Sequence, residues 1–290
     1  MAKPGDADVA LSEKEKQAVD DNKHPRAQVL YEAIRVEGEQ ELARTPWALA
    51  LSGLAAGMSM GFSLVAMALI RAALPDAPWA KLVVSFGYCV GFVIVIVARQ
   101  QLFTENTLTP VIPMLQQKNL STFVRMLRLW GVVLAANLLG TLAFAFVIQH
   151  TTVFAPDVKK AFAAFGEHAL QGGFGSHFMG AVFSGWLIAL MMWTLAGAEA
   201  RIFIVVVITY LVGLGDLSHV IAGSTEAFYA VFDGKASWLQ YVSGFLVPVA
   251  LGNLIGGITL VAVLSHAQIS ADGEREPDAE AERHPEQPLA

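Results

Sequence analysis

The stretches 99-RQQLFTEN-106 and 213-GLGDLSH-219 each interrupt a hydrophobic segment that is otherwise long enough to cross a lipid bilayer. Lipid offers no partner for a free N–H, a free C=O or a charged side chain, so such breaks persist only around a protected or water-lined cavity. The breaks lie in the second and fifth of six hydrophobic segments, which are matching positions in two halves of three. Paired breaks of this kind indicate a polar pathway through the membrane.

Six windows reach the length of about 20 apolar residues that a bilayer core requires. The second and fifth are too long for one straight crossing, so we predict two half-helices joined by a non-helical stretch in each. The sequence therefore predicts an all-α membrane protein with six transmembrane helices. The windows are residues 46–70, 80–116, 123–148, 178–196, 202–232 and 238–264.

The composition agrees with a membrane protein. Of the 290 residues, 55% are hydrophobic and 15% are charged, whereas about a quarter of the residues of a soluble domain are charged. The charges concentrate in the two ends of the chain, and the net charge of −6 argues against a nucleic-acid partner. No nucleotide-binding loop and no His/Cys cluster with metal-ligand spacing occurs, so we expect no enzyme, no cofactor and no metal.

Charge also divides the chain and predicts its orientation. Residues 1–45 form an N-terminal arm with an amphipathic helix near 26–44, residues 46–265 form the membrane domain, and residues 266–290 form an acidic tail that is predicted to be disordered. The side of the two termini collects thirteen Lys and Arg, against five on the other side. Both termini are therefore expected in the cytoplasm. The arm either rests against the helix bundle or acts as a gating lid.

Small residues recur at a spacing of three to five in the first and last segments, for example at Gly53, Gly57, Gly252 and Gly256. Small residues let membrane helices approach closely. Their distribution predicts that the first and last segments pack together.

His219 is the only histidine in the middle of a hydrophobic segment. Burial disfavours the charged imidazole, whereas an approaching anion favours it. His219 would then give a proton, or a strong hydrogen bond, to an entering anion and spare it the cost of crossing as a bare charge. The alternative is that His219 bonds a free carbonyl and holds the break together. Thr104 either bonds the permeant or His219, or caps the half-helix that follows it.

These residues resemble motifs of the formate/nitrite transporter family. The run 102-LFT-104 is similar to the family's Leu-Phe-Thr loop, and 218-SHVIA-222 is similar to its histidine-centred break. The run 248-PVALGNLIGG-257 is similar to its sixth helix and is the most specific match. The resemblance covers about residues 46–265.

The resemblance implies an aquaporin-like protomer with an inverted 3+3 repeat and broken second and fifth helices. It further implies a homopentamer in the bacterial inner membrane with one pore in each protomer, and transport of small monovalent anions such as formate or nitrite. In that arrangement Thr104 and His219 face each other across a narrow vestibule, with Leu102 and Phe103 in the same pore loop.

The chain departs from the family at several positions, which place it in a divergent branch. Arg99, Gln100 and Gln101 replace a usual run of Gly, a small residue and an acid. The run 184-SGW-186 lacks a usual Asn, no lysine occurs at 167–171, and Ser218 precedes the histidine where Glu is common in the formate branch.

An arginine such as Arg99 within a span costs about 2.5–3.5 kcal/mol on insertion scales, so it needs a partner or a purpose. It either makes the pore electropositive or forms an ion pair with Glu105 or Asp216. Three residues lie one to three turns from the breaks and are candidates for apolar constrictions: Phe92, Tyr88 and Val212.

The sequence thus predicts a channel or transporter in the lipid bilayer for a small monovalent anion or its conjugate acid. Two alternatives stay open. One is a pore for small neutral solutes or weak acids, and the other is a non-conducting membrane protein that retains the fold.

Overall fold

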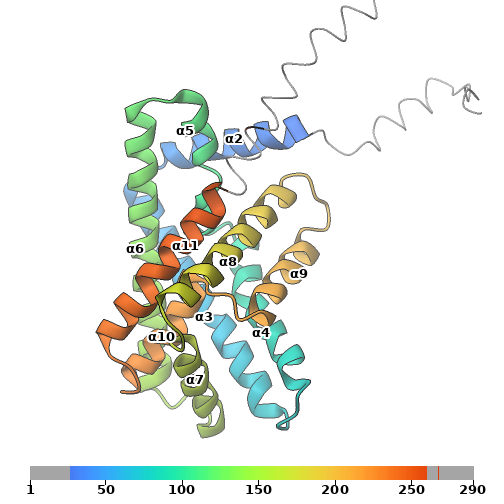
Figure 1. Ribbon diagram of the computed structural model, residues 1–290, viewed down its shortest axis with the longest axis vertical. Coiled ribbons are helices and arrows are strands. Elements are labelled where there is room, and N and C mark those ends of the chain that lie inside the picture. Colours follow the sequence, from blue (N-terminus) through green and yellow to red (C-terminus); the bar gives the residue numbers. More distant parts are fainter. Residues whose placement is uncertain (1–26, 260–266, 268–290) are drawn as a thin grey trace, which may run out of the picture.

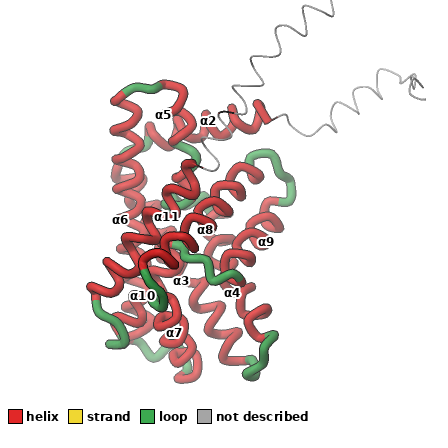
Figure 2. Tube along the Cα trace, in the orientation of Figure 1, coloured by secondary structure: helices red, strands yellow, loops and turns green. Residues whose placement is uncertain are grey.

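Every regular element in the described part of the chain is a helix (Figure 2). The computed structural model describes residues 27–259 and residue 267. The start of the N-terminal arm, the end of the sixth predicted segment and almost all of the predicted tail lie outside the described residues. The elements are α2 (Ala27–Ala43), α3 (Pro46–Ala73), α4 (Ala80–Val97), η1 (Glu105–Thr107), α5 (Val111–Gln117), α6 (Leu120–His150), α7 (Pro156–Ala169), α8 (Phe174–Leu195), α9 (Arg201–Leu214), α10 (Val220–Phe232), η2 (Gln240–Leu246) and α11 (Val247–Gly257).

Four helices of the described chain, α3, α4, α6 and α8, are long and apolar enough to cross a membrane. The shorter apolar helices α9 and α10 together make up the fifth predicted segment. Large apolar side chains are exposed on one face of α3, at Leu51, Met58, Phe62 and Leu69. Their spacing of four or seven residues is that of a single helix face, which suits contact with lipid or with a neighbouring chain. The prediction of an all-α membrane protein is confirmed, while the count of six crossings stays a prediction.

The helices are arranged between two ends of an elongated bundle (Figure 1). Helix α2 lies across one end beside α5, and α7 lies at the opposite end. Between them, α3 packs against α4 and α6, α8 packs against α11, and α4 packs against α9. Helix α10 contacts both α6 and α7, so the two halves of the chain are packed into one body.

Helix α2 is amphipathic and packs against the bundle through one face. Tyr31, Ile34, Gly38 and Leu42 are buried, at a spacing of three or four residues. Arg35 lies outside this face and pairs with Glu32 and Glu39 on its own helix.

The helices α4 and α9 end in the same way. The N–H of Gln100 donates to the carbonyl of Val95 at 3.0 Å, and the N–H of Leu217 donates to the carbonyl of Val212 at 3.0 Å. Each bond spans a residue whose backbone has the left-handed helical conformation, and this pattern is the Schellman motif at the end of a helix. The left-handed residue is usually glycine, but here it is Arg99 with φ +51° and Asp216 with φ +49°.

A buried asparagine of α6 bonds both sides of the first break. The Nδ2 of Asn137 donates to the carbonyl of Gln101 at 2.9 Å, and its Oδ1 accepts from the N–H of Phe103 at 2.9 Å. The same Nδ2 also donates to the carbonyl of Gly53 on α3 at 2.7 Å. The side chain therefore satisfies backbone groups that the broken helix leaves free.

An asparagine of α11 does the same for the second break. The Nδ2 of Asn253 donates to the carbonyl of Ser218 at 3.2 Å, and its Oδ1 accepts from the N–H of Val220 at 2.9 Å. It also donates to the carbonyl of Ala181 on α8 at 2.8 Å. In both breaks the asparagine side chain bonds the carbonyl of one residue and the N–H of the residue two positions later in the chain. This match is what an internal repeat of three helices would produce.

Glycines let each asparagine come close to its neighbouring helix. A Cβ at Gly57 would lie 2.1 Å from the carbonyl oxygen of Asn137, and a Cβ at Gly185 would lie 2.3 Å from that of Asn253. The first segment therefore packs through its glycines against α6, and the glycines of the last segment face α8. The expected packing of the first segment on the last is wrong, because each half pairs its own first and third helices.

Two elements differ from the sequence-based expectation. Helix α7 occupies the connection between the third and fourth segments, where no helix was predicted, and it packs against α3 and α10. The sixth segment begins with the π-helical turn η2 before α11. Pro248 stands in the first turn of α11 and has no N–H to donate to the preceding turn, which accounts for the irregular start.

We predict that Asn137→Ala and Asn253→Ala each destabilise the folded protein strongly. Each change leaves a buried N–H and a buried carbonyl at a break without a partner, at about 1–3 kcal/mol for each group. Thermal unfolding in detergent measures the loss. The matched control is Asn119→Ala, where Asn119 caps the exposed start of α6 and the cost is about 1 kcal/mol. Equal destabilisation by all three variants would show that the two buried amides do not support the breaks.

Candidate functional site

The two breaks meet at a hydrogen bond between Thr104 and His219. Thr104 Oγ1 lies 2.8 Å from His219 Nε2. Both side chains are fully buried, with exposed fractions of 0% and 1%. The structure therefore brings together the two residues that the sequence predicted to face each other.

The second nitrogen of His219 fixes its tautomer. His219 stands at the N-cap of α10, where Nδ1 accepts from the N–H groups of Ile221 at 3.3 Å and Ala222 at 3.2 Å. A nitrogen that accepts these bonds carries no proton, so the proton of the neutral ring is on Nε2. Nε2–H then donates to Thr104 Oγ1, and the Thr104 hydroxyl keeps its own hydrogen for another acceptor. His219 thus holds its break together through N–H groups, whereas the alternative prediction had invoked a carbonyl.

Thr104 does not cap the helical turn that follows it. Its side chain makes no capping bond to η1, and its backbone has helical torsion angles, φ −70° and ψ −28°. An N-cap residue usually has an extended backbone, so the expected capping role is not found. The hydroxyl is aimed at His219 instead.

Aromatic side chains pack beside this pair. The ring of Phe92 contacts the imidazole of His219 edge to face, with centroids 5.0 Å apart, and Tyr88 lies next to Phe92 at 5.4 Å. Phe92 and Val212 are fully buried, and Tyr88 is nearly so. Their role as constrictions stays a prediction, although they surround the site as expected. Leu102 and Phe103 are also buried in the loop of the first break.

Two cavities lie on either side of the Thr104–His219 pair. The α7-side cavity, of about 860 Å³, is lined by Tyr88, Val212 and His219 and by residues of α7. The α2-side cavity, of about 800 Å³, is lined by Arg99 and by residues of α2 and α9. The buried pair therefore stands between two open vestibules.

Charges in the α7-side cavity form a cluster around the second break. Lys81 Nζ lies 2.6 Å from Asp216 Oδ2, and His168 Nε2 lies 3.6 Å from Asp216 Oδ1. Arg71 and Glu226 line the same cavity. The cavity thus holds two fixed bases and two acids and is not strongly positive.

Charges in the α2-side cavity include four acids and three bases, which are Glu37, Glu41, Glu105, Glu199, Arg44, Arg99 and Arg201. Within the described residues, Arg99 makes no ion pair. The alternative that Arg99 pairs with Glu105 or Asp216 is therefore wrong. Arg99 lines the α2-side cavity, and Asp216 pairs with Lys81 of α4 and His168 of α7.

Several polar residues of the site were missed by the sequence analysis. Asn137, Asn253, His177 and Glu226 are all polar side chains within apolar helices, and each lies at a break or in a cavity. Their polarity in an apolar helix was the available signal, because such residues are costly in a membrane unless they have a role. Among the described residues, no group of three or more His, Cys, Asp or Glu is placed to hold a metal ion.

Apolar spanning helices, two matched breaks and a buried polar pair between two cavities define a membrane protein of the transporter class. The sequence model of the formate/nitrite transporter family matches residues 28–267, and the chain belongs to this family. The resemblance stated from the motifs is thereby confirmed.

Known relatives agree with this assignment. The chain is 40% identical to the inner membrane protein YfdC of Escherichia coli over 96% of this chain and 92% of that protein. It is 23% identical to the formate channel FocA of Haemophilus influenzae, over 76% of this chain and 86% of that protein. A solved pentameric formate channel with formate bound superposes with a TM-score of 0.65 at 20% identity, over 77% of this chain and 97% of that one. An ion channel of the same family superposes with a TM-score of 0.66 at 17% identity, over 82% of this chain and 94% of that one.

We predict that Asp216→Asn lowers the pKa of His168. The ion pair with Asp216 holds the pKa of His168 above its usual value. With a raised pKa in the folded state, the pair contributes its full stability below the unfolded pKa of about 6.5 and loses it as the pH rises through the folded pKa. Histidine NMR titration in nanodiscs measures the change, with His150, which lies away from Asp216, as the internal control. An unshifted His168 pKa in the variant would contradict the pairing.

Proposed function

We propose that this protein conducts a small monovalent anion such as formate or nitrite, or its conjugate acid, past the Thr104–His219 pair. The observation that carries the proposal is the direct bond between these side chains, buried between two cavities, in a member of the formate/nitrite transporter family. The names of the relatives, which include formate channels, support the same class of permeant.

The permeant replaces the bond that closes the pathway. When the mutual contact opens, His219 Nε2–H is released as a donor, and the hydrogen of the Thr104 hydroxyl, which the contact does not use, is a second donor. A carboxylate or nitrite oxygen can accept from both. The exchange spares the permeant the cost of entering a dry region without partners.

The bonding of His219 favours hydrogen-bond donation over proton transfer. A neutral imidazole that gave up its Nε2 proton would become an imidazolate, which is far too basic to form near neutral pH. Protonation at Nδ1 would first have to displace the N–H groups of Ile221 and Ala222. We therefore assign His219 as a donor that stays neutral, so a permeant that crosses as the conjugate acid takes its proton from elsewhere.

A second function, a pore for weak acids or small neutral solutes, is favoured by the charges in the cavities. Both cavities contain acidic as well as basic side chains, four acids and three bases on the α2 side and two of each on the α7 side. A neutral acid can also accept from the two donors at the pair, although these bonds are weaker than those to an anion. Its desolvation costs less than that of an anion.

The same family membership supports the assembly and the location that we propose. We propose that the protein forms a homopentamer in the bacterial inner membrane. The α2 end and both termini face the cytoplasm. We further propose that residues 46–265 are the conducting unit and contain six crossings in an inverted 3+3 repeat. The matched asparagine bonds of the two breaks support the repeat.

We propose that Arg99 draws permeants into the α2-side cavity. A left-handed backbone costs a residue other than glycine about 1 kcal/mol or more, so arginine at this position is not explained by the helix ending. Strain of this kind is often retained for function. The side chain lines the cavity without an ion pair among the described residues.

We expect that His219→Phe and Thr104→Val each lower formate flux into liposomes at least tenfold. Thr104→Val removes one donor, whereas His219→Phe removes the Nε2 donor together with the Nδ1 cap of α10. A lost hydrogen bond in a buried site costs about 1–3 kcal/mol. Nitrite, hydrosulfide, lactate and glycerol are tested in parallel. The matched control is Thr194→Val, because Thr194 bonds within α8 and lies outside both cavities. Unchanged flux in the His219 variant would reject the mechanism, and no flux for any solute in the parent protein would favour the non-conducting alternative.

We predict that Arg99→Gln lowers anion flux by about threefold to tenfold at low salt, and less at high salt, because surface charges are screened. Glycerol flux stays unchanged, since a neutral solute does not respond to the charge. Arg125→Gln is the control, because Arg125 bonds Thr122 on its own helix and lies outside both cavities. Arg99→Gln with a full rate of anion flux would remove Arg99 from the pathway.

A further inference from the structure

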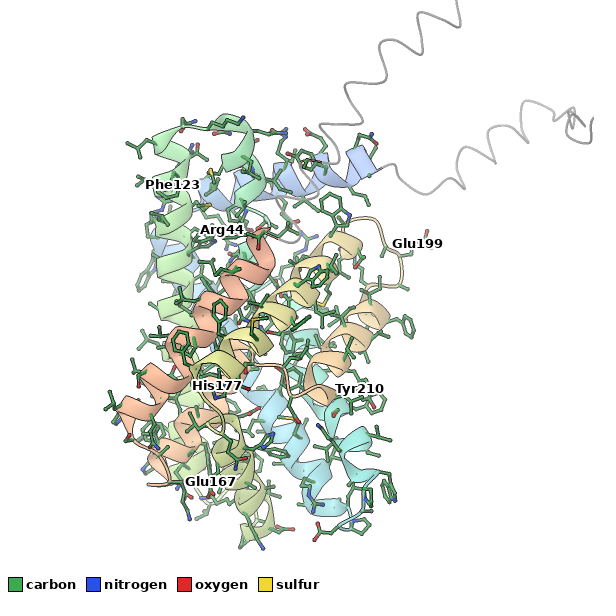
Figure 3. The ribbon with its side chains drawn as sticks, viewed as in Figure 1. Arg44, Phe123, Glu167, His177, Glu199 and Tyr210 are labelled. Atoms are coloured by element: carbon green, nitrogen blue, oxygen red, sulfur yellow. The ribbon has the colours of Figure 1, made fainter. Side chains whose placement is uncertain are left out.

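A second hydroxyl–imidazole pair lies in the α7-side cavity. His177 Nδ1 is 3.2 Å from Ser218 Oγ, and Ser218 directly precedes His219 in the chain. His177 belongs to the first turn of α8 and is only 6% exposed. In Figure 3 it lies between Arg44 near the α2 end and Glu167 near the α7 end. None of the functional roles assigned above uses this histidine.

The other nitrogen of His177 has no partner. Nε2 is buried and makes no hydrogen bond within the described residues. An unpaired buried polar atom is costly, so it points to a ligand that supplies the missing bond. The atom lies beside Gly172, where a Cβ would be 3.6 Å away, and the adjacent Gln171 and Ser176 line the same cavity.

Ser218 orients the imidazole. Its carbonyl accepts from Ser184 Oγ at 2.5 Å and from Asn253 Nδ2 at 3.2 Å, so the backbone that bears its hydroxyl is held by two neighbours. On the other side, the ring of His177 contacts Phe245 edge to face, with centroids 5.5 Å apart. The ring is therefore fixed between a hydroxyl and an aromatic side chain.

The Ser218 hydroxyl can either donate to Nδ1 or accept from it. When it donates, Nε2 carries the hydrogen and can bond an anionic oxygen. When it accepts, Nε2 has a lone pair and can accept the O–H of a carboxylic or nitrous acid. The pair can thus take either protonation state of one weak acid without changing its own charge.

We propose that His177, oriented by Ser218, is a binding residue that holds the permeant in the α7-side cavity before or after it passes His219. The ligand is a small monovalent carboxylate or oxyanion or its conjugate acid. The proposal rests on the proposed function and adds a second binding site for the permeant to it. Two hydroxyl–imidazole pairs, on consecutive residues of one break, would then carry the permeant in turn.

The test compares formate flux into liposomes over a range of concentrations for the parent protein, His177→Phe, His177→Gln and Ser218→Ala. Phenylalanine keeps a ring against Phe245 and lacks both nitrogens, while glutamine restores one donor and one acceptor. The control is His150→Phe, because His150 is exposed at the end of α6 and lies outside both cavities.

We expect His177→Phe to raise the half-saturating formate concentration about tenfold, the equivalent of one hydrogen bond of about 1.4 kcal/mol. The maximal rate should stay within about twofold of the parent rate, since His177 does not belong to the buried Thr104–His219 contact. His177→Gln should recover part of the loss, and Ser218→Ala should give a smaller rise. An unchanged half-saturating concentration in His177→Phe would overturn the proposal. A fall in the maximal rate alone would also overturn it, by showing a merely structural role.

A binding measurement separates this proposal from the proposed function. Protein with ¹⁵N-labelled histidine in nanodiscs is titrated with formate, and we expect a saturable shift of one imidazole signal that is absent in His177→Phe. If the parent protein conducts no solute but the shift is found, transport fails and the binding residue stands. If the parent conducts and neither the shift nor the half-saturating concentration depends on His177, the binding residue fails and the proposed function stands.

Discussion

The bonds of Asn137 and Asn253 to the two broken helices are the constraint on which the rest of the structure depends. A break in a membrane helix exposes N–H and C=O groups that lipid cannot satisfy. One asparagine in each half bonds a carbonyl and an N–H two residues apart, and it also bonds the neighbouring first helix of its own half. Close approach at Gly57 and Gly185 belongs to the same arrangement, because a Cβ at either position would collide with an asparagine carbonyl.

The site chemistry follows from this backbone geometry. Asn253 fixes Val220 at the start of α10, and the next free N–H groups are directed at His219 Nδ1. His219 is consequently a donor at Nε2, toward Thr104 of the other half. The residue that stabilises the helix start is thus also the residue that we propose to contact the permeant. The structural role of His219 uses Nδ1, and the proposed functional role uses Nε2 of the same ring.

The sequence was enough to predict the helical class and both breaks, because each depends on polar residues placed in apolar segments. The meeting of Thr104 with His219 was implied by the resemblance to the formate/nitrite transporter family. It was not enough to identify the partners of Asn137 and Asn253, since those bonds join helices far apart in the chain. The packing of the first segment on the last was wrongly expected, because glycine spacing shows that a helix packs closely but not against which neighbour. An ion pair was one of two roles expected for Arg99, whereas Arg99 ends a helix and lines the α2-side cavity without an ion pair among the described residues.

The dryness of the Thr104–His219 contact has a consequence for the energy balance of a cell. Both side chains are almost completely buried, and Thr104 Oγ1 contacts His219 Nε2 directly at 2.8 Å. Protons move through proteins along unbroken files of water or along groups that can both take up and release a proton. His219 interrupts such a file, because its Nδ1 is occupied by backbone N–H groups. We therefore expect this closed contact to block the passage of protons between the two cavities, so that a membrane containing the protein can keep its proton gradient.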